Sequence, residues 1–264
     1  MENEKVAAYI REWLADYLAT SRAKGFVVGI SGGVDSALVS TLCAGAGAPV
    51  LCLTLPIHQA ASHVGRAEEH CRFLVGRYPN VRVQEIDLTG PFDALAGVLP
   101  RSGAGKKDNL ALANTRSRLR MTALYHAASL EGYLVAGTGN KIEDFGVGFF
   151  TKWGDGGVDL SPIGDLTKTE VFELSAYLGV CRSILEAEPS DGLFDEDQTD
   201  SMQIGATYPE LEWAMEQVAQ GHTEKDFAGR QAEVMRIYAT RHAANRHKMS
   251  PIPVCVIPDG LKKE

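Results

Sequence analysis

The chain has 264 residues, of which 45% are hydrophobic and 23% are charged, so its composition is that of an ordinary globular protein with a sizeable core. No apolar run approaches the roughly 20 residues that span a bilayer, and the acidic, amphipathic first residues do not resemble a secretory signal. We therefore expect no membrane partner and a cytoplasmic location. The formal net charge of −8 argues against nucleic acid as a bulk partner.

The first half of the chain alternates between segments that predict helices and segments that predict strands. Apolar side chains recur at steps of three and four from Val6 to Leu18, as on one face of an amphipathic helix. The predicted order is helix 6–18, strand 26–30, helix 36–46, strand 49–55, helix 58–78 and strand 81–86. This alternation predicts an α/β fold with an open parallel sheet and helices on both faces.

The second half predicts longer helices separated by loops. The charged, Gly-rich segment 100–108 predicts a mobile loop, and Thr167 and Glu170 have the spacing of a capping box that begins a helix. The other predictions are a helix at about 109–130, a strand at 133–138, irregular chain over 146–157, an acidic loop over 189–201, helices near 208–220 and 223–244, and a Pro-rich tail. With no internal repeat and no linker, we expect a single domain over 1–264.

The cysteines and most histidines carry no recognisable chemistry. The five cysteines form no C-x-x-C pair, which disfavours zinc fingers and disulfide scaffolds. We expect them to be core thiols of a protein from a reducing compartment. They are Cys43, Cys52, Cys71, Cys181 and Cys255. Apart from His247, the histidines show no metal-ligand spacing, and we assign them no catalytic role.

The turn over 29–36 is the most informative part of the sequence. It reads Gly-Ile-Ser-Gly-Gly-Val-Asp-Ser and lies between a predicted strand and a predicted helix. Bare backbone N–H groups and the helix dipole at such a turn favour a phosphate. Asp35 would repel that phosphate unless a cation lies between them, which indicates a Mg²⁺-bound phosphate. The alternative is a tight turn whose serines only cap the helix.

The segment Ser31 to Ser36 does not match a Walker A loop or a G-x-G-x-x-G fingerprint. It resembles the SGGxDS pyrophosphate loop of the N-type ATP pyrophosphatases, which cleave ATP between its α- and β-phosphates and adenylate a second substrate. The resemblance implies a Rossmann-like adenine nucleotide alpha hydrolase fold. It also implies that ATP is bound by Gly29, Ile30, Ser31, Gly32, Gly33, Val34, Asp35 and Ser36.

Three further stretches resemble the NAD synthetase family within this group. Residues 114–121 are similar to its N-x-x-A-R-x-R-M helix, with Ser117 where alanine is usual. Residues 137–159 are similar to its GTxNxxE…GFFTKYGDGGxD block, with Trp153 where tyrosine is usual. The third set is Leu166-Thr167-Lys168, Glu188-Pro189-Ser190 and His247-Lys248. The matches extend from about residue 29 to 248, which is most of the chain.

The family resemblance implies roles for individual residues. Thr138, Lys168 and Ser190 would bind ATP, and Asp35 and Glu143 would hold Mg²⁺. Deamido-NAD⁺ would be bound by Arg118, Lys152, Asp159, His247 and Lys248. The residues themselves leave structural alternatives open. Arg118 could lie on a solvated basic face, and Glu143 could stabilise the start of a helix, where the dipole favours a carboxylate.

These roles imply an activity. ATP would adenylate deamido-NAD⁺, and ammonia would then give NAD⁺ with release of AMP and pyrophosphate. We expect Asp35 and Lys168 to act in catalysis, with Asp155 taking a proton from ammonium, although Asp155 in a Gly-Asp-Gly turn also suits a structural role. Family members that use glutamine carry an amidase domain of roughly 250 more residues, for which this chain has no room, so we expect ammonia as the donor. A separate amidotransferase subunit is the alternative source.

Two other functions remain as rivals. One is another adenylating enzyme, such as a GMP synthetase or a tRNA thiolase, although the thiolases generally need reactive cysteine pairs. The other is a nucleotide-binding module without chemistry, as in electron-transfer flavoproteins of the same fold. The family resemblance also implies a homodimer with the dinucleotide site at the subunit interface.

Overall fold

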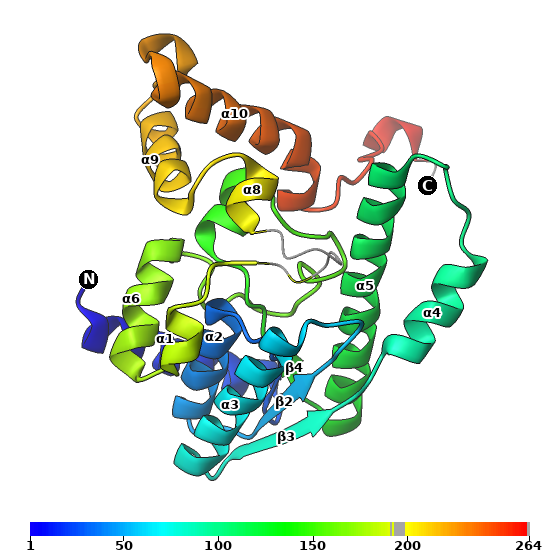
Figure 1. Ribbon diagram of the computed structural model, residues 1–264, viewed down its shortest axis with the longest axis vertical. Coiled ribbons are helices and arrows are strands. Elements are labelled where there is room, and N and C mark those ends of the chain that lie inside the picture. The colour runs from blue at the N-terminus through cyan, green and yellow to red at the C-terminus, as the bar shows by residue number, and fades with distance from the viewer. Residues whose placement is uncertain (191, 193–198, 263–264) are drawn as a thin grey trace.

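The computed structural model describes residues 1–190, 192 and 199–262, and a parallel sheet lies at its centre (Figure 1). The strand order is β3–β2–β1–β4. The strands are β1 (Phe26–Gly29), β2 (Val50–Thr54), β3 (Val81–Glu85) and β4 (Leu134–Val135). Phe26 lies opposite Val50 on one side and Leu134 on the other, with both pairs parallel. The predicted α/β fold with an open parallel sheet is therefore confirmed.

Helices cover both faces of the sheet because alternate strand residues point to opposite faces. Phe26 and Val28 pack into one core with α1, α2, α3 and α6, while Val27 packs into a second core with α4 and α5. Near-continuous apolar strands suit such a doubly covered sheet. The helices are α1 (Asn3–Ser21), α2 (Val34–Gly45), α3 (Ala61–Arg77), α4 (Thr89–Val98), α5 (Gly105–Glu131), α6 (Lys168–Leu178) and α7 (Arg182–Leu185).

A third layer of helices lies beyond the sheet, at the top of Figure 1. Its core joins Tyr208, Leu211 and Tyr238 to Ile142, which begins a short π-helix. The elements of this layer are η1 (Ile142–Val147), α8 (Asp200–Ile204), α9 (Tyr208–Ala219), η2 (Glu224–Asp226) and α10 (Gly229–Met249), and η3 (Asp259–Leu261) follows in the tail. This layer brings residues after position 200 next to the segment that follows β4.

Four predictions about local structure are wrong or incomplete. The loop predicted over 100–108 ends early, because Asp108 accepts hydrogen bonds from Ser102 and Gly103 and fixes the turn before α5 begins at Gly105. Helix α4 was not predicted, since its Gly and Pro residues are typical of turns, yet it buries Phe92. The strand expected over 133–138 is shorter, and Thr138 lies beyond it. Helix α10 begins at Gly229 rather than 223 because a 3₁₀ turn precedes it.

The cysteines fall into two groups. Cys43, Cys52 and Cys71 are buried thiols, as predicted. The prediction is wrong for Cys255, which is exposed because the tail after α10 lies outside the cores, and Cys181 is half-buried. None of the helices in the described part of the chain combines the length and apolar composition needed to cross a bilayer.

Candidate active site

A pocket opens at the carboxyl ends of β1 and β4. The chain passes from β1 to β2 on one side, whereas on the other side the segment after β4 forms a parallel bridge between Ala136 and Leu160. Such a switch point is where open α/β sheets bind ligands. All the residues that the sequence predicts for ATP line this one pocket: Gly29, Ile30, Ser31, Gly32, Gly33, Val34, Asp35, Ser36, Thr138, Lys168 and Ser190.

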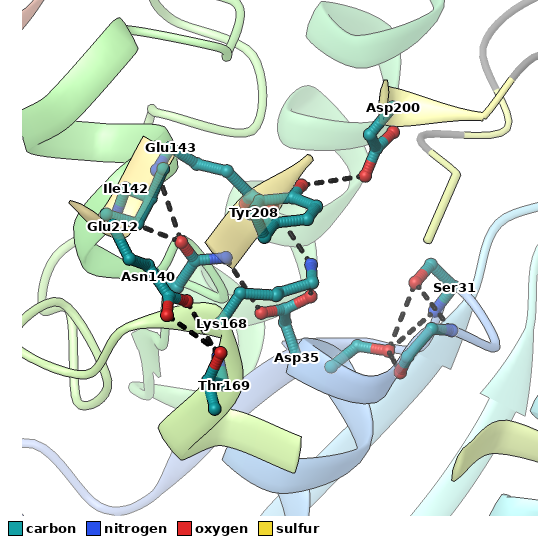
Figure 2. Close-up of polar contacts among 12 residues, drawn as sticks. Ser31, Asp35, Asn140, Ile142, Glu143, Lys168, Thr169, Asp200, Tyr208 and Glu212 are labelled. Carbon is teal, nitrogen blue, oxygen red and sulfur yellow. Dashed lines mark hydrogen bonds and ion pairs between the residues drawn. The ribbon is translucent and has the colours of Figure 1, made fainter. Parts of the chain in front are cut away.

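The turn between β1 and α2 is shaped by glycine and closed by serine. Gly32 has a φ of 84°, and a Cβ there would lie 2.5 Å from the carbonyl oxygen of His63, so only glycine fits. Ser36 donates a hydrogen bond of 3.0 Å to the carbonyl of Gly33, and its Oγ lies 3.1 Å from that of Ser31 (Figure 2). The serines therefore hold the turn, as the plainer reading expects, and the same turn presents the start of α2 to the pocket.

A buried ion cluster lies beside this turn. The ammonium of Lys168 is 2.6 Å from Oδ2 of Asp35 and 3.0 Å from Oε1 of Glu143 (Figure 2). Lys168 is the first residue of α6, where the predicted capping box of Thr167 and Glu170 is present and fixes the helix start. The cluster thus joins the segments after β1 and β4 to α6.

The charges in this cluster alter one another's protonation. Burial raises the pKa of Glu143 to about 7, although the nearby ammonium of Lys168 opposes that change. Burial by itself lowers the pKa of Lys168, but the carboxylates of Asp35 and Glu143 outweigh it, so the pKa is raised. Lys168 therefore stays positively charged.

The donor set of Asp35 and Glu143 suits a magnesium ion. Both carboxylates reach the same ammonium, so their oxygens converge on one small region. Mg²⁺ is commonly bound by one or two carboxylates together with substrate phosphates, rather than by a cage of protein groups. Over residues 1–190, 192 and 199–262, no group of three or more His, Cys, Asp or Glu side chains gathers to hold a metal. The two carboxylates fit a magnesium ion that arrives with ATP.

Sequence reasoning missed three residues of this cluster. The hydroxyl of Tyr208 is 2.5 Å from Oε1 of Glu143 and 2.8 Å from Oδ2 of Asp200, and its ring centroid lies 4.7 Å from the Lys168 ammonium. Asn140 donates a hydrogen bond of 3.1 Å to Asp35. The available sequence signal was the Thr207–Glu210 capping box, which fixes the start of α9 immediately before the tyrosine.

Asp155 lies at the pocket in a tightly held turn. Its Oδ1 accepts hydrogen bonds from the Ser117 hydroxyl at 2.5 Å and from the Thr151 amide at 3.0 Å, and its own amide donates to Ser117 at 2.8 Å. The carboxylate therefore does the structural work expected of a turn aspartate. Because Asp155 also lines the pocket, this does not remove it as a candidate for ammonia chemistry.

The residues predicted for deamido-NAD⁺ lie outside the lining of this pocket. Arg118 donates to the carbonyl of Lys152 at 3.3 Å, and Lys152 donates to that of His247 at 2.6 Å. Lys248 donates to the carbonyls of Gly148 and Phe150. These four residues thus come together where α5, the chain after η1 and the end of α10 meet.

Asp159 is not part of this basic group. One of its carboxylate oxygens accepts a hydrogen bond of 2.8 Å from the amide of Val135, and the other accepts one of 3.0 Å from the hydroxyl of Tyr125. The carboxylate therefore holds the edge of β4 against α5. The structure gives Asp159 a structural function that its motif did not predict.

Comparisons with known proteins agree with the sequence motifs. A family model described as NAD synthase matches residues 6–252. An NH(3)-dependent NAD(+) synthetase of Syntrophomonas wolfei is 37% identical over 264 residues, covering 99% of this chain and 100% of that protein. One of Carboxydothermus hydrogenoformans is 43% identical over 206 residues, or 76% and 80% of the two chains. A solved structure of NMN synthetase from Francisella tularensis superposes with a TM-score of 0.82 at 29% identity, covering 98% of this chain and 99% of that one.

Proposed function

Because the chain belongs to the NAD synthase family, we propose that it converts deamido-NAD⁺ to NAD⁺ with ATP and ammonia, releasing AMP and pyrophosphate. Two relatives at 37% and 43% identity are named NH(3)-dependent NAD(+) synthetases, which supports ammonia as the nitrogen donor. The observation that carries the proposal is the meeting of the start of α2, Asp35, Glu143 and Lys168 in one pocket.

The first step forms a mixed anhydride. The pyridine carboxylate of deamido-NAD⁺ attacks the α-phosphorus of ATP, the bond to the β-phosphate breaks, and pyrophosphate leaves. Backbone amides of Gly32 and Gly33, with the Ser36 hydroxyl, bind the leaving pyrophosphate at the start of α2. Lys168 neutralises negative charge on the phosphates. Asp35 and Glu143 would hold Mg²⁺, which offsets further phosphate charge when bound.

The second step replaces adenylate by nitrogen. Ammonia attacks the activated carbonyl carbon, the bond to the AMP oxygen breaks, and the nitrogen gives one proton to water. Asp155 would bind the ammonium ion and accept its proton before attack. Its fixed carboxylate favours this role, because positioning reduces the entropy lost when the two reactants meet.

The second substrate would bind on the basic group of Arg118, Lys152, His247 and Lys248. Their partners in the structure are mostly backbone carbonyls, so the charges remain available to phosphates. Asp159 would contribute through a carboxylate lone pair left over from its contacts with Val135 and Tyr125. We further propose a single domain over 1–264, a homodimer whose interface borders this group, and a cytoplasmic location.

A second candidate substrate is the mononucleotide acid that corresponds to NMN. The observation in its favour is that the Francisella tularensis protein, which superposes over almost the whole chain, is named NMN synthetase. The chemistry at the shared pyridine carboxylate would be the same, and only the binding of the second nucleotide half would differ. Comparing kcat/KM for the mononucleotide and the dinucleotide acid decides between them.

The proposal is tested with the purified chain, ATP, Mg²⁺ and deamido-NAD⁺. We expect pyrophosphate release to require deamido-NAD⁺, and NAD⁺ to form with ammonium but not with glutamine. Pyrophosphate release that requires an acceptor other than deamido-NAD⁺ would favour another adenylating enzyme, and nucleotide binding without release would favour a binding module. If NAD⁺ forms from glutamine when cell extract is added, but not with the purified chain by itself, a separate amidotransferase subunit is indicated.

A further inference from the structure

The hydroxyl of Tyr208 lies between two carboxylates beside the ion cluster. It is 2.5 Å from Glu143 and 2.8 Å from Asp200, which come from segments on either side of α6 in the chain (Figure 2). A phenolic hydroxyl carries one proton that it can donate. A single proton is therefore available to two acceptors, and the shorter contact is to Glu143.

The ring of Tyr208 is fixed by its place in the fold. Tyr208 begins α9, whose capping box holds the backbone at Thr207 and Glu210. The residue is only 5% exposed and packs in the core of the third layer with Ile142 and Leu211. A rigid, buried ring can hold its hydroxyl in one place, which a surface tyrosine cannot.

The same ring also contacts the catalytic lysine. The ammonium of Lys168 lies 4.7 Å from the ring centroid, within the range of a cation–π contact. Tyr208 therefore touches both Glu143, through its hydroxyl, and Lys168, through its face. Asp200, which also contacts the hydroxyl, donates its amide to the carbonyl of Pro189. Tyr208 therefore links Asp200 to Glu143 and Lys168 in the pocket.

We propose that Tyr208 is a positioning residue of the adenylation centre, and that its hydroxyl fixes the Glu143 carboxylate in the orientation that binds Mg²⁺ with ATP. This inference rests on the proposed function, because it assigns Glu143 to the metal. A free Glu143 side chain would sample other rotamers, and ordering it on binding would cost free energy. The hydroxyl removes that cost in advance. The ring contact with Lys168 is a separate contribution that survives loss of the hydroxyl.

The matched pair of variants is Tyr208→Phe and Tyr238→Phe. The first loses the hydroxyl and keeps the ring beside Lys168. The second removes the hydroxyl of a tyrosine in the same core, for which the described part of the chain offers no hydrogen-bond partner. Calorimetry with the non-cleavable analogue α,β-methylene-ATP, with and without Mg²⁺, measures the gain in affinity that the metal provides. We expect Tyr208→Phe to reduce that gain by about tenfold, as for loss of one charged hydrogen bond, and Tyr238→Phe to leave it unchanged.

A double-mutant cycle tests whether the effect passes through Glu143. In a Glu143→Gln background, we expect Tyr208→Phe to have no further effect on the Mg²⁺-dependent gain. In turnover, Tyr208→Phe should lower kcat for pyrophosphate release while the KM for ammonium stays constant. An equal loss in both backgrounds, or equal behaviour of the two Phe variants, would overturn the inference. The binding assay needs no turnover, so it tests this inference even if the proposed reaction is wrong. Wild-type chain that binds Mg-ATP but forms no NAD⁺ would show that the proposed reaction has failed.

Discussion

The buried ion cluster and the partly exposed basic group differ in how their charges are held. In the cluster, Asp35, Glu143 and Lys168 satisfy one another at distances of 2.6 to 3.0 Å, with little contact with solvent. In the basic group, Arg118 and Lys152 donate mainly to backbone carbonyls. The side chains of the cluster are held by attraction between opposite charges, whereas those of the basic group are held by hydrogen bonds to the backbone. A substrate that binds at the cluster therefore has to compete with ion pairs that already exist. At the basic group, its phosphates can instead provide the anions that these cations lack.

The largest expected effect is loss of the only cation in the buried cluster as the structure describes it. Replacing Lys168 by Met leaves Asp35 and Glu143 buried without a counter-charge, which costs about 3 to 5 kcal/mol of unfolding free energy. We expect pyrophosphate release to fall by about 10²- to 10³-fold or more. Urea unfolding and a pyrophosphate assay measure the two effects.

The matched control is Lys141→Met. Lys141 pairs with Asp165 at 2.9 Å, but the carboxylate of this pair is almost fully solvated. Such a surface pair contributes little, so unfolding free energy and activity should stay near wild type. Equal destabilisation by the two substitutions would mean that the buried cluster is not held by its charge balance.

The basic group predicts a different kind of loss. Replacing Lys152 by Ala removes a cation that the proposed function assigns to phosphate, and we expect the KM for deamido-NAD⁺ to rise about tenfold, since a charged hydrogen bond contributes about 1.5 kcal/mol. The KM for ATP and the unfolding free energy should hardly change. Lys5→Ala, at a surface pair on α1, serves as the control. A parallel rise in the KM for ATP would show that the two regions are not separate.

The sequence predicts the two regions unequally. The turn over 29–36 and the start of α6 are local features, so glycine and capping signals place Asp35 and Lys168 at element ends without knowledge of the tertiary fold. Tyr208 could not be found this way, because its contact with Glu143 spans 65 residues and depends on how the third layer packs. The motif assigned Asp159 to the dinucleotide but could not reveal its hydrogen bond with the amide of Val135, which depends on how β4 is placed.

Helix α4 shows the same limit in the fold. Gly90, Pro91 and Gly97 weaken every local helix signal, yet the segment folds because Phe92 is buried against the sheet and the guanidinium of Arg116 on α5 lies over its ring. Tertiary packing overrides propensity there. The strands and long helices were predictable because their apolar periodicity and their burial agree.

A carboxyl group between the two regions gives a pH-dependent prediction. Burial raises the pKa of Asp144 to about 8, and the charges of Glu143 and Asp155 add to the effect. The folded protein therefore holds this proton more tightly than the unfolded chain, whose reference pKa is 3.8. Stability contributed by the protonated side chain is present below pH 4 and is lost as pH rises toward 8.

Asn at position 144 cannot titrate, so the stability of Asp144→Asn relative to wild type should increase with pH over this window. The expected slope is at most about 1.4 kcal/mol per pH unit between the two pKa values, and it falls to zero above the pKa of the folded protein. Urea unfolding at pH 5, 6, 7 and 8 measures it. If the difference in unfolding free energy between the variant and wild type does not vary with pH, Asp144 does not hold a proton in this pH range.

The smallest expected effect concerns how firmly Asp155 is held. Ser117→Ala removes a hydroxyl that donates to the carboxylate at 2.5 Å and accepts from its amide at 2.8 Å, and leaves the contact from Thr151. Alanine suits the middle of α5, so the helix should remain intact. Since one of two contacts to the carboxylate remains, we expect amide formation to slow by about three- to tenfold, with a higher KM for ammonium.

The adenylation step separates this effect from general damage to the pocket. The proposed mechanism uses Asp155 only after pyrophosphate has left, so pyrophosphate release by Ser117→Ala should match wild type. Asp155→Asn should affect the same step more strongly, and the double variant should be no slower than Asp155→Asn alone, because the serine acts through the aspartate. Equal slowing of both half-reactions would instead mean that Ser117 and Asp155 only shape the turn at the edge of the pocket.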